Sequence, residues 1–327
     1  MRKKASPSLP SAAFLNKNLM RQEVHEMNEN KKKFAGIYPA TITPFTVDNR
    51  INREAMLTLM RRNMKEGAKG LFIGGSSAEC FLLTPQERKH TYEIASELKG
   101  KTNLIAHVGA ISTDQAIDYA KYARELGFDA IAATPPFYYG FDSRSICQYY
   151  YDIYEAVGMP LIIYNFPGNT GKEFNLADPN YRQLFRSPAI MGVKHTNQVV
   201  YQMERIRNLD PELVIFNGYD ETMVAGLALG ADGSVGSTFN FMLPHYKLIF
   251  DTFRGGDTAK ALEMQVKANN IMEALCSVGL SPAIKYVLRT QGIAAGEARR
   301  PFLPLTEEQK KYIDDVIRDN LITGPEE

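Results

Sequence analysis

From residue 36 onward, short apolar segments alternate with longer segments in which apolar residues recur at helical spacing. The apolar segments are nearly continuous in hydrophobic residues, which is typical of strands in a parallel sheet that is covered on both faces. We expect strands at residues 36–43, 70–75, 103–108, 130–134, 160–165, 189–194, 213–218 and 233–238.

The segments between these strands carry helix start and stop signals. Thr84 is a predicted N-cap, Pro85 takes the first helical position and Glu87 completes a capping box. Ser112 or Thr113 begins the next helix, which ends at a glycine. Strands that alternate with helices predict parallel pairing through crossovers. A count of eight favours an α/β fold that closes into a (β/α)8 TIM barrel over an open doubly wound sheet.

The two ends of the chain differ from this pattern. We assign residues 36–242 to the barrel core and residues 243–327 to the last barrel helix and a C-terminal helical extension, whose final helix starts after Thr306. Residues 1–35 begin with a basic, Ser/Pro-containing stretch that lacks acids, and we expect a disordered tail. An upstream start codon, with the true start at one of two later methionines, or an organellar transit peptide also fits this composition.

Composition and charge exclude several classes of function. The chain has 327 residues and a net charge of +1, so neither nucleic acid nor an acidic membrane is an expected partner. No apolar run approaches the roughly 18 residues that span a bilayer. The three cysteines are scattered, which favours a reducing cytoplasm, and the five histidines show no metal-ligand spacing. No GxGxxG follows the first strand and no P-loop motif occurs, which disfavours nucleotide binding.

Candidate chemistry begins with Lys194, which stands directly at the end of the sixth apolar segment. A buried lysine loses its proton more easily, and the neutral amine is a nucleophile that can form a Schiff base with a ketone. A lysine at a strand end can also extend its amine into water. Tyr164 ends the fifth segment and could transfer a proton, or it could simply fill the core.

Other polar residues follow the remaining strands, and a TIM barrel gathers such residues at one mouth. Glycine beside tandem serines would let a carboxylate approach the backbone closely, although this composition is also common in turns. The acidic pair after the seventh strand could instead cap the next helix. The candidates are Ser76, Ser77, Tyr138, Thr196, Gly218, Asp220, Glu221 and Ser237.

Five stretches of the chain read as family motifs: "GGSSAECFLLTPQER", "TPPFYYG", "YNFPGNTG", "GVKHT" and "GADGSVGSTFN". In sequence and in order they resemble the motifs of the N-acetylneuraminate lyase and dihydrodipicolinate synthase superfamily. The resemblance runs from about residue 36 to the C-terminus. It implies a pyruvate-type class I aldolase that needs no metal and no cofactor beyond a covalent Schiff base, that acts on a small-molecule 2-keto acid and that forms a homotetramer.

The resemblance also implies roles for individual residues. Lys194 matches the Schiff-base lysine and Tyr164 the proton-transfer tyrosine. Ser76 and Ser77 match the positions that bind the pyruvate carboxylate. Tyr138 matches a proton-relay tyrosine associated with a subunit interface.

Within the superfamily, "NGYDE" and "GSTFN" are most similar to N-acetylneuraminate lyase. The similarity implies that the sugar-acid chain would contact Thr196, Gly218, Asp220, Glu221 and Ser237. Asn169 stands where dihydrodipicolinate synthase carries an arginine for a second carboxylate, which argues against an aspartate-semialdehyde partner. The preferred expectation is therefore cleavage of N-acetylneuraminate to N-acetylmannosamine and pyruvate.

One position departs from the lyase pattern. The usual "GGSTGE" is here "GGSSAE", so Ser77 keeps a hydroxyl while Ala78 replaces a glycine. If the loop needs positive φ at this position, alanine would strain it. The alternatives are therefore an aldolase or dehydratase for another 2-keto-3-deoxy sugar acid, a dihydrodipicolinate synthase-like condensation, or an inactive sugar-acid-binding protein.

Overall fold

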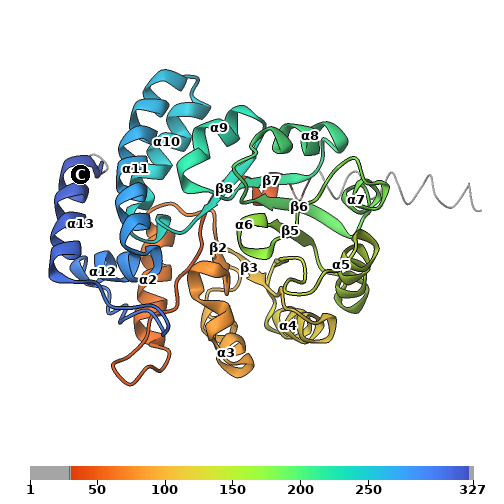
Figure 1. The fold of residues 1–327 in the computed structure, drawn as a ribbon, viewed down its shortest axis with the longest axis horizontal. Coiled ribbons are helices and arrows are strands. Elements are labelled where there is room, and N and C mark those ends of the chain that lie inside the picture. Colours follow the sequence, from red (N-terminus) through yellow and green to blue (C-terminus); the bar gives the residue numbers. More distant parts are fainter. Residues whose placement is uncertain (1–28, 30, 324–327) are drawn as a thin grey trace, which may run out of the picture.

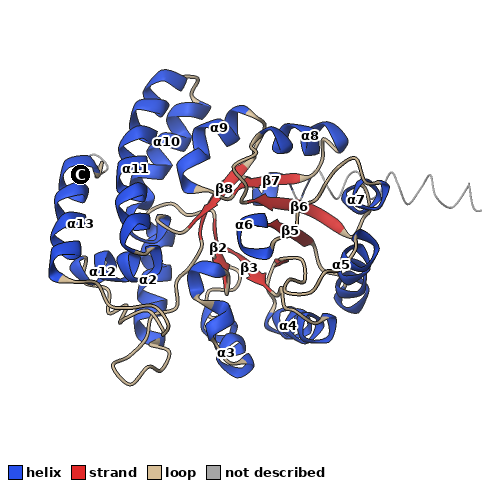
Figure 2. Ribbon diagram, viewed as in Figure 1, coloured by secondary structure: helices blue, strands red, loops and turns tan. Residues whose placement is uncertain are grey.

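A computed structural model describes residue 29 and residues 31–323 of the chain. Eight parallel strands form one sheet in the order β1-β8-β7-β6-β5-β4-β3-β2. The sheet closes between its two outer strands, where Thr41 N donates to Phe72 O over 2.9 Å and Ala40 pairs with the same residue. Helices surround the strands (Figures 1 and 2), so the predicted TIM barrel is confirmed.

Each predicted strand is present within or close to its expected range. The strands are β1 (Ile37–Pro39), β2 (Gly70–Ile73), β3 (Asn103–His107), β4 (Ala130–Ala133), β5 (Leu161–Asn165), β6 (Ile190–His195), β7 (Val214–Asn217) and β8 (Gly233–Gly236). Almost every strand residue is buried, because barrel side chains fill one face of each strand and the helices cover the other.

The longer helices of the barrel and the extension are α2 (Arg53–Lys65), α3 (Pro85–Ser96), α4 (Thr113–Leu126), α5 (Ser143–Val157), α10 (Phe239–Arg254), α11 (Thr258–Val278), α12 (Leu280–Thr290) and α13 (Glu307–Asn320). The shorter ones are α6 (Pro167–Thr170), α7 (Pro179–Phe185), α8 (Tyr201–Leu209) and α9 (Met223–Ala228). Three 3-10 turns add η1 (Ser76–Ala78), η2 (Cys80–Leu82) and η3 (Asp220–Thr222).

The predicted helix signals are used as expected. Thr84 and Glu87 form the capping box of α3, Ser112 caps α4, and Gly127 ends α4 in the left-handed conformation with φ +79°. Thr306 caps α13. These caps satisfy backbone N–H and C=O groups that the helix itself leaves unpaired, which explains why local sequence sets these boundaries.

The C-terminal helices lie on one side of the barrel (Figure 1), where α11 packs against both α10 and α13. α10 is interrupted at Met242, which has non-helical φ −135°, two residues before Pro244. No single helix in the described part of the chain is long and apolar enough to cross a membrane. α11 and α12 reach that length and hydropathy only together, across a bend of 117°.

The amino end of the barrel is closed by residues that precede the first strand. Residues 31–34 are helical and Phe34 is fully buried with the side chains that fill the barrel interior. Asn103 Nδ2 donates to Lys33 O over 2.9 Å, and Lys33 Nζ lies 2.6 Å from Asp129 Oδ1. The packed chain therefore begins before Gly36, and the rest of the expected tail, residues 1–28 and 30, lies outside the described residues.

Candidate active site

A cavity of about 320 Å³ opens at the carboxyl ends of the strands. It brings together most of the residues singled out from the sequence, which lie far apart along the chain. The predicted residues that line it are Ser76, Ser77, Tyr164, Asn169, Lys194, Thr196, Gly218, Asp220 and Ser237. Tyr138 and Glu221 do not line it.

Lys194 lies near the end of β6 and pairs in register with Tyr164 of β5. Its Nζ is 3.9 Å from the centroid of the Tyr164 ring and 4.5 Å from that of Phe72, and the residue is only 4% exposed. Burial lowers the pKa of Lys194 to about 7, against a smaller upward effect of the Asp220 carboxylate. The amine is thus desolvated inside the barrel rather than extended into water, and a neutral nucleophile is accessible near pH 7.

Tyr164 stands beside this amine with its hydroxyl inside the cavity. Its ring stacks on Phe166, with centroids 5.7 Å apart, and meets Phe72 edge-on at 5.9 Å. The hydroxyl oxygen lies 3.4 Å from Ser76 Oγ, so a proton could pass between the two hydroxyls. Burial raises the pKa of Tyr164, which keeps its proton available at neutral pH.

The loop after β2 that carries Ser76 and Ser77, called the serine loop below, has a backbone conformation that accommodates Ala78. Ser76–Ala78 forms a 3-10 turn, and the positive φ values of the loop lie on either side of it, at Gly74 with +72° and at Glu79 with +58°. Thr43 Oγ1 donates to Ala78 O over 2.8 Å, which fixes the turn from the end of β1. The strain considered for Ala78 is absent, because this residue is not in the left-handed region.

Asp220 is buried, and its carboxylate accepts hydrogen bonds at the start of α10. Thr238 N and Thr238 Oγ1 donate to Oδ2 over 2.8 and 2.6 Å, and Ser237 N donates to Oδ1 over 3.3 Å. Burial raises the pKa of Asp220, and these donors oppose the rise. The Asp220 carboxylate therefore caps a helix, as the alternative interpretation predicted. That helix is α10, across the barrel mouth, and not the helix that follows Asp220 in sequence.

The remaining predicted residues after β6 and β7 include two whose buried oxygens are unpaired in the described part of the chain. Glu221 is partly buried, and its Oε2 has no hydrogen-bond partner among the described residues. The hydroxyl of Thr196 is likewise buried and unpaired within the described chain. A Cβ at Gly218 would collide with that hydroxyl, which explains the glycine. Unpaired buried oxygens beside or near a cavity are suited to polar groups of a ligand.

One wall of the cavity was not predicted from the sequence. It is formed largely by the C-terminal extension together with aromatic residues after β5 and β7. Its residues are Phe166, Tyr219, Met272, Leu280, Ser281, Ile284 and Phe302. The excess of helical pattern after residue 238 was the only available signal, and it does not show which helix face meets the barrel mouth.

Tyr138 lies apart from this cavity in its own chain. The side chain is 83% exposed and follows β4 in a backbone conformation with φ +79°. Its ring contacts Tyr139 edge-on, with centroids 5.1 Å apart. A left-handed conformation is uncommon for a bulky residue and places this tyrosine outward from the barrel.

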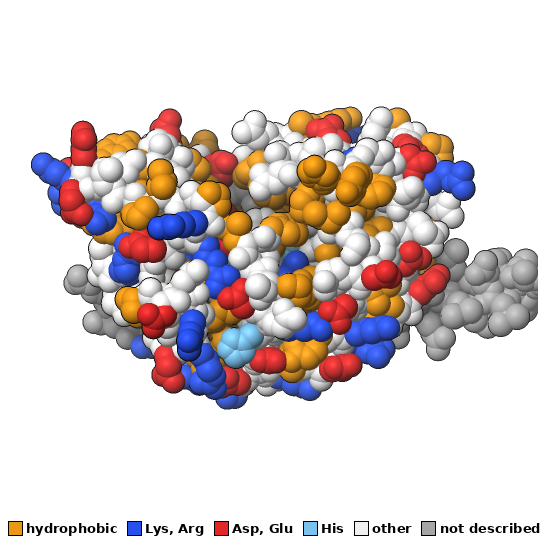
Figure 3. Space-filling model, turned by 60° about the horizontal axis from the view of Figure 1, so that its bottom comes forward, with side chains coloured by type: hydrophobic (Ala, Val, Ile, Leu, Met, Phe, Trp, Pro, Cys, Tyr) orange, Lys and Arg blue, Asp and Glu red, His pale blue; other side chains and the backbone are white. Residues whose placement is uncertain are grey.

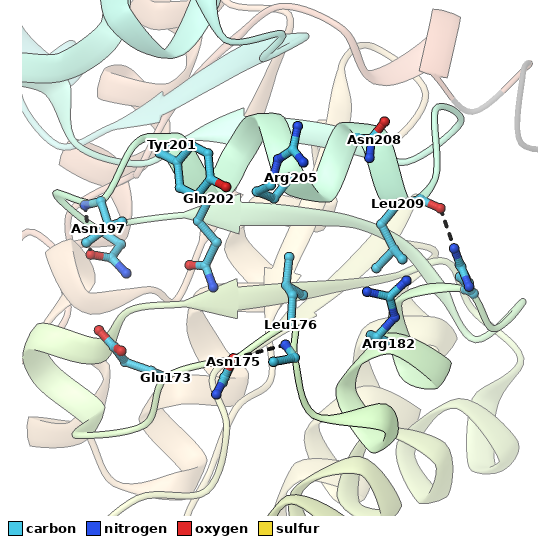
Figure 4. A pocket seen from close by; sticks show the side chains of 13 residues that line it. Glu173, Asn175, Leu176, Arg182, Asn197, Tyr201, Gln202, Arg205, Asn208 and Leu209 are labelled. Carbon is cyan, nitrogen blue, oxygen red and sulfur yellow. Dashed lines mark hydrogen bonds between the residues drawn. The ribbon is translucent and has the colours of Figure 1, made fainter.

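A larger groove of about 600 Å³ lies between α7 and α8 (Figure 4). Its charged side chains, which include Arg182, Arg186 and Arg205, are exposed, and none of the predicted site residues lines it. Gln202 at its base donates to Phe174 O over 2.6 Å. The groove lacks a buried nucleophile, so the candidate active site is the smaller cavity at the barrel mouth.

Comparisons with known proteins agree with this geometry. The family model described as "Dihydrodipicolinate synthetase family" matches residues 33–320. An N-acetylneuraminate lyase of Rhizobium meliloti is 38% identical over 276 residues, which cover 84% of this chain and 91% of that protein.

Two solved structures share the fold. CdNal from Clostridium difficile in complex with mannosamine has a TM-score of 0.84 at 36% identity, covering 88% of this chain and 99% of the other. The N-acetylneuraminate lyase of Fusobacterium nucleatum complexed with pyruvate has a TM-score of 0.83 at 34% identity, covering 89% and 98%. The chain therefore belongs to the dihydrodipicolinate synthetase family.

Proposed function

We propose that this protein is a class I aldolase-type lyase that cleaves N-acetylneuraminate to N-acetylmannosamine and pyruvate through a Schiff base on Lys194. The observation that carries the proposal is the buried amine of Lys194, which faces the ring of Tyr164 in a cavity at the barrel mouth. The similarity to N-acetylneuraminate lyases over most of the chain supports the choice of reaction.

The reaction begins at the C2 ketone of the open-chain substrate. Neutral Lys194 Nζ attacks this carbon, and loss of water gives a protonated imine that can accept electrons. Removal of the C4 hydroxyl proton lets the C3–C4 bond break. Its electron pair moves into the imine to form an enamine, and C4 leaves as the aldehyde of N-acetylmannosamine. Protonation of the enamine at C3 and addition of water to the imine then release pyruvate and restore the amine.

Proton transfer falls to Tyr164 in this scheme. Its ring centroid lies 3.9 Å from the amine, and the 3.4 Å separation between its hydroxyl and Ser76 Oγ offers a path for the C4 proton. Because burial raises the pKa of Tyr164, its hydroxyl stays protonated at neutral pH, so it takes the C4 proton only as it passes its own proton to Ser76 Oγ, and the reverse relay returns a proton to C3 of the enamine. No metal is required, since the imine itself is the electron sink.

Substrate binding divides between the two ends of the cavity. The hydroxyls and backbone N–H groups of Ser76 and Ser77 would hold the carboxylate of the 2-keto acid. Thr196 and Ser237, which line the cavity, would bind hydroxyl groups of the sugar chain. Glu221, which follows the lining residue Asp220 in sequence, would meet the part of the chain that extends beyond the lining. The apolar wall from α11 and α12 would exclude water from the bond that breaks.

We also infer a homotetramer in which Tyr138 reaches the active site of a neighbouring copy. Its exposure in the single chain and its distance from the chain's own cavity support this arrangement. The surface shown in Figure 3 carries a gathering of apolar side chains, which favours contact with another protein surface. The three cysteines are all unpaired thiols, which supports a reducing cytoplasm as the location.

A screen for pyruvate release tests the reaction. Purified protein is incubated with N-acetylneuraminate and with a six-carbon 2-keto-3-deoxy acid, and pyruvate is measured over time. We expect release from N-acetylneuraminate that disappears in Lys194→Arg, because a guanidinium stays protonated and cannot form the imine. Release from the shorter acid alone would move the protein to another sugar-acid aldolase, and release from neither would contradict a lyase.

A further inference from the structure

The serine loop has two residues with positive φ; the first is Gly74, with φ +72°, and the second is a glutamate. Glu79 has φ +58° and ψ 34°, directly after the turn that carries Ser76 and Ser77. Glycine adopts this conformation without strain, whereas glutamate does not. The strain indicates that the Glu79 side chain has a use at this position that glycine could not serve.

Both oxygens of the Glu79 carboxylate bind the C-terminal extension. Oε1 lies 2.6 Å from Lys285 Nζ of α12, and each of these two side chains is only 1% exposed. Oε2 accepts a hydrogen bond from Arg299 N over 2.7 Å. Lys285 Nζ also donates to Glu297 O over 3.1 Å. This buried ion pair is therefore tied on both sides by further hydrogen bonds, which is the condition for such a pair to be stable.

The same extension holds the chain beyond the serine loop. Arg299 Nη1 donates to Leu82 O over 3.1 Å and to Glu87 Oε2 over 2.8 Å. These contacts anchor the segment from the loop to the first turn of α3. The serine loop is thus fixed from the extension at several successive points.

α12 also contributes to the wall of the cavity. Leu280, Ser281 and Ile284 line it, and Ile284 is the residue next to Lys285. One helix therefore carries both the wall that faces the body of the substrate and the cation that holds the carboxylate-binding loop. The Glu79–Lys285 contact links these two surfaces directly.

We propose that Glu79 and Lys285 are positioning residues, which set the serine loop against α12 and so fix the distance between the carboxylate end of the cavity and its far wall. The inference rests on the proposed function, because it assigns the serine loop to a substrate carboxylate. It differs from a purely structural role. A buried ion pair that contributes only to stability can often be replaced by neutral side chains at little cost, and its replacement leaves substrate affinity unchanged. Replacement of a positioning pair lowers substrate affinity.

The test compares Glu79→Gln with a control on a second ion pair. Asp232 Oδ2 lies 2.5 Å from Arg207 Nη2, next to β8 at the amino end of the barrel and away from the cavity. Three quantities are measured for each purified variant: the pyruvate concentration that half-saturates borohydride trapping, and KM and kcat for N-acetylneuraminate. Melting temperatures are recorded for both.

We expect Glu79→Gln to raise the half-saturating pyruvate concentration and KM at least tenfold, with a smaller change in kcat. Asp232→Asn should lower the melting temperature and leave both concentrations within twofold of the wild type. Wild-type affinities in Glu79→Gln, or equal losses in Asp232→Asn, would overturn the inference. Absence of trapping in the wild type would instead overturn the proposed function.

A second variant covers the case in which Glu79→Gln does not fold because the Lys285 ammonium is left buried and unpaired. The double variant Glu79→Gln, Lys285→Met removes both charges at similar volume. A folded double variant with a raised half-saturating pyruvate concentration supports the positioning role. Wild-type affinity in that variant refutes it.

Discussion

The pH dependence of imine formation follows from the burial of Lys194. Burial lowers the pKa of Lys194 from 10.5 to about 7. A shift of this size corresponds to roughly 5 kcal/mol against the ammonium, at 1.36 kcal/mol per pKa unit. At pH 7 about half of the amine is neutral, compared with roughly 3 in 10,000 for an unperturbed lysine. The larger neutral fraction therefore raises the rate at which the amine attacks the ketone on the order of a thousandfold.

The Asp220 carboxylate is the charge to perturb, because it raises the pKa of Lys194 against the effect of burial. Asp220→Asn removes this charge at nearly constant volume. The pKa of Lys194 should then fall further, and imine formation should persist to lower pH. The variant should also lose stability, since Thr238 donates twice to the carboxylate and hydrogen bonds to a charged group contribute roughly 1.5–3 kcal/mol each.

The assay is the initial rate of pyruvate trapping by borohydride as a function of pH. The wild-type rate should rise with pH, reach half its maximum near pH 7 and level off above it, because only the neutral amine attacks. The midpoint of Asp220→Asn should lie at lower pH. Asp232→Asn serves as the control for lost stability and should keep the wild-type midpoint. A wild-type midpoint near 10, or an unchanged or raised midpoint in Asp220→Asn, would refute the electrostatic explanation.

Three further predictions follow from the site and the fold. Tyr164→Phe should still form the pyruvate adduct but release pyruvate from N-acetylneuraminate at least about a hundredfold more slowly in steady-state assays, since general acid–base groups contribute roughly that much. Glu221→Gln should lower kcat/KM for N-acetylneuraminate by about tenfold, in line with one charge-assisted hydrogen bond, while a six-carbon acid is cleaved as before. A chain that starts at Asn28 should keep the wild-type melting temperature, whereas Phe34→Ala should cost roughly 3–5 kcal/mol in denaturant unfolding.

Local sequence predicted the barrel because the relevant forces are local or periodic. Nearly continuous apolar runs mark strands that are buried on both faces, and caps such as Thr84 and Thr306 follow from hydrogen bonds within a few residues. The cluster at the mouth was predictable in the same way. Once eight parallel strands close a barrel, Lys194 and Tyr164 must lie at its carboxyl end.

Features of the structure that depend on contacts between residues far apart in the sequence were not predicted. Nothing in the helical pattern of α11 and α12 indicates that Met272 and Ile284 line the cavity, because that depends on how the extension packs on the barrel. The start of the packed chain was placed too late, because Phe34 is buried by residues of several strands that lie far from it in the sequence. The string "GGSSAE" did not show that a non-glycine residue takes positive φ in the serine loop, where Glu79 adopts it in addition to Gly74 and Ala78 does not.

The central claim is that Lys194 is the amine that forms the Schiff base. The most direct measurement is borohydride reduction in the presence of pyruvate, followed by peptide mapping of the modified residue. Lys285 makes the test selective, because it is also buried and its pKa is lowered to about 8, but its Nζ is held by Glu79. We predict a reduced pyruvyl adduct on Lys194 alone, and none in Lys194→Arg. An adduct on Lys285 or on any other lysine, or no adduct at all, would contradict the account.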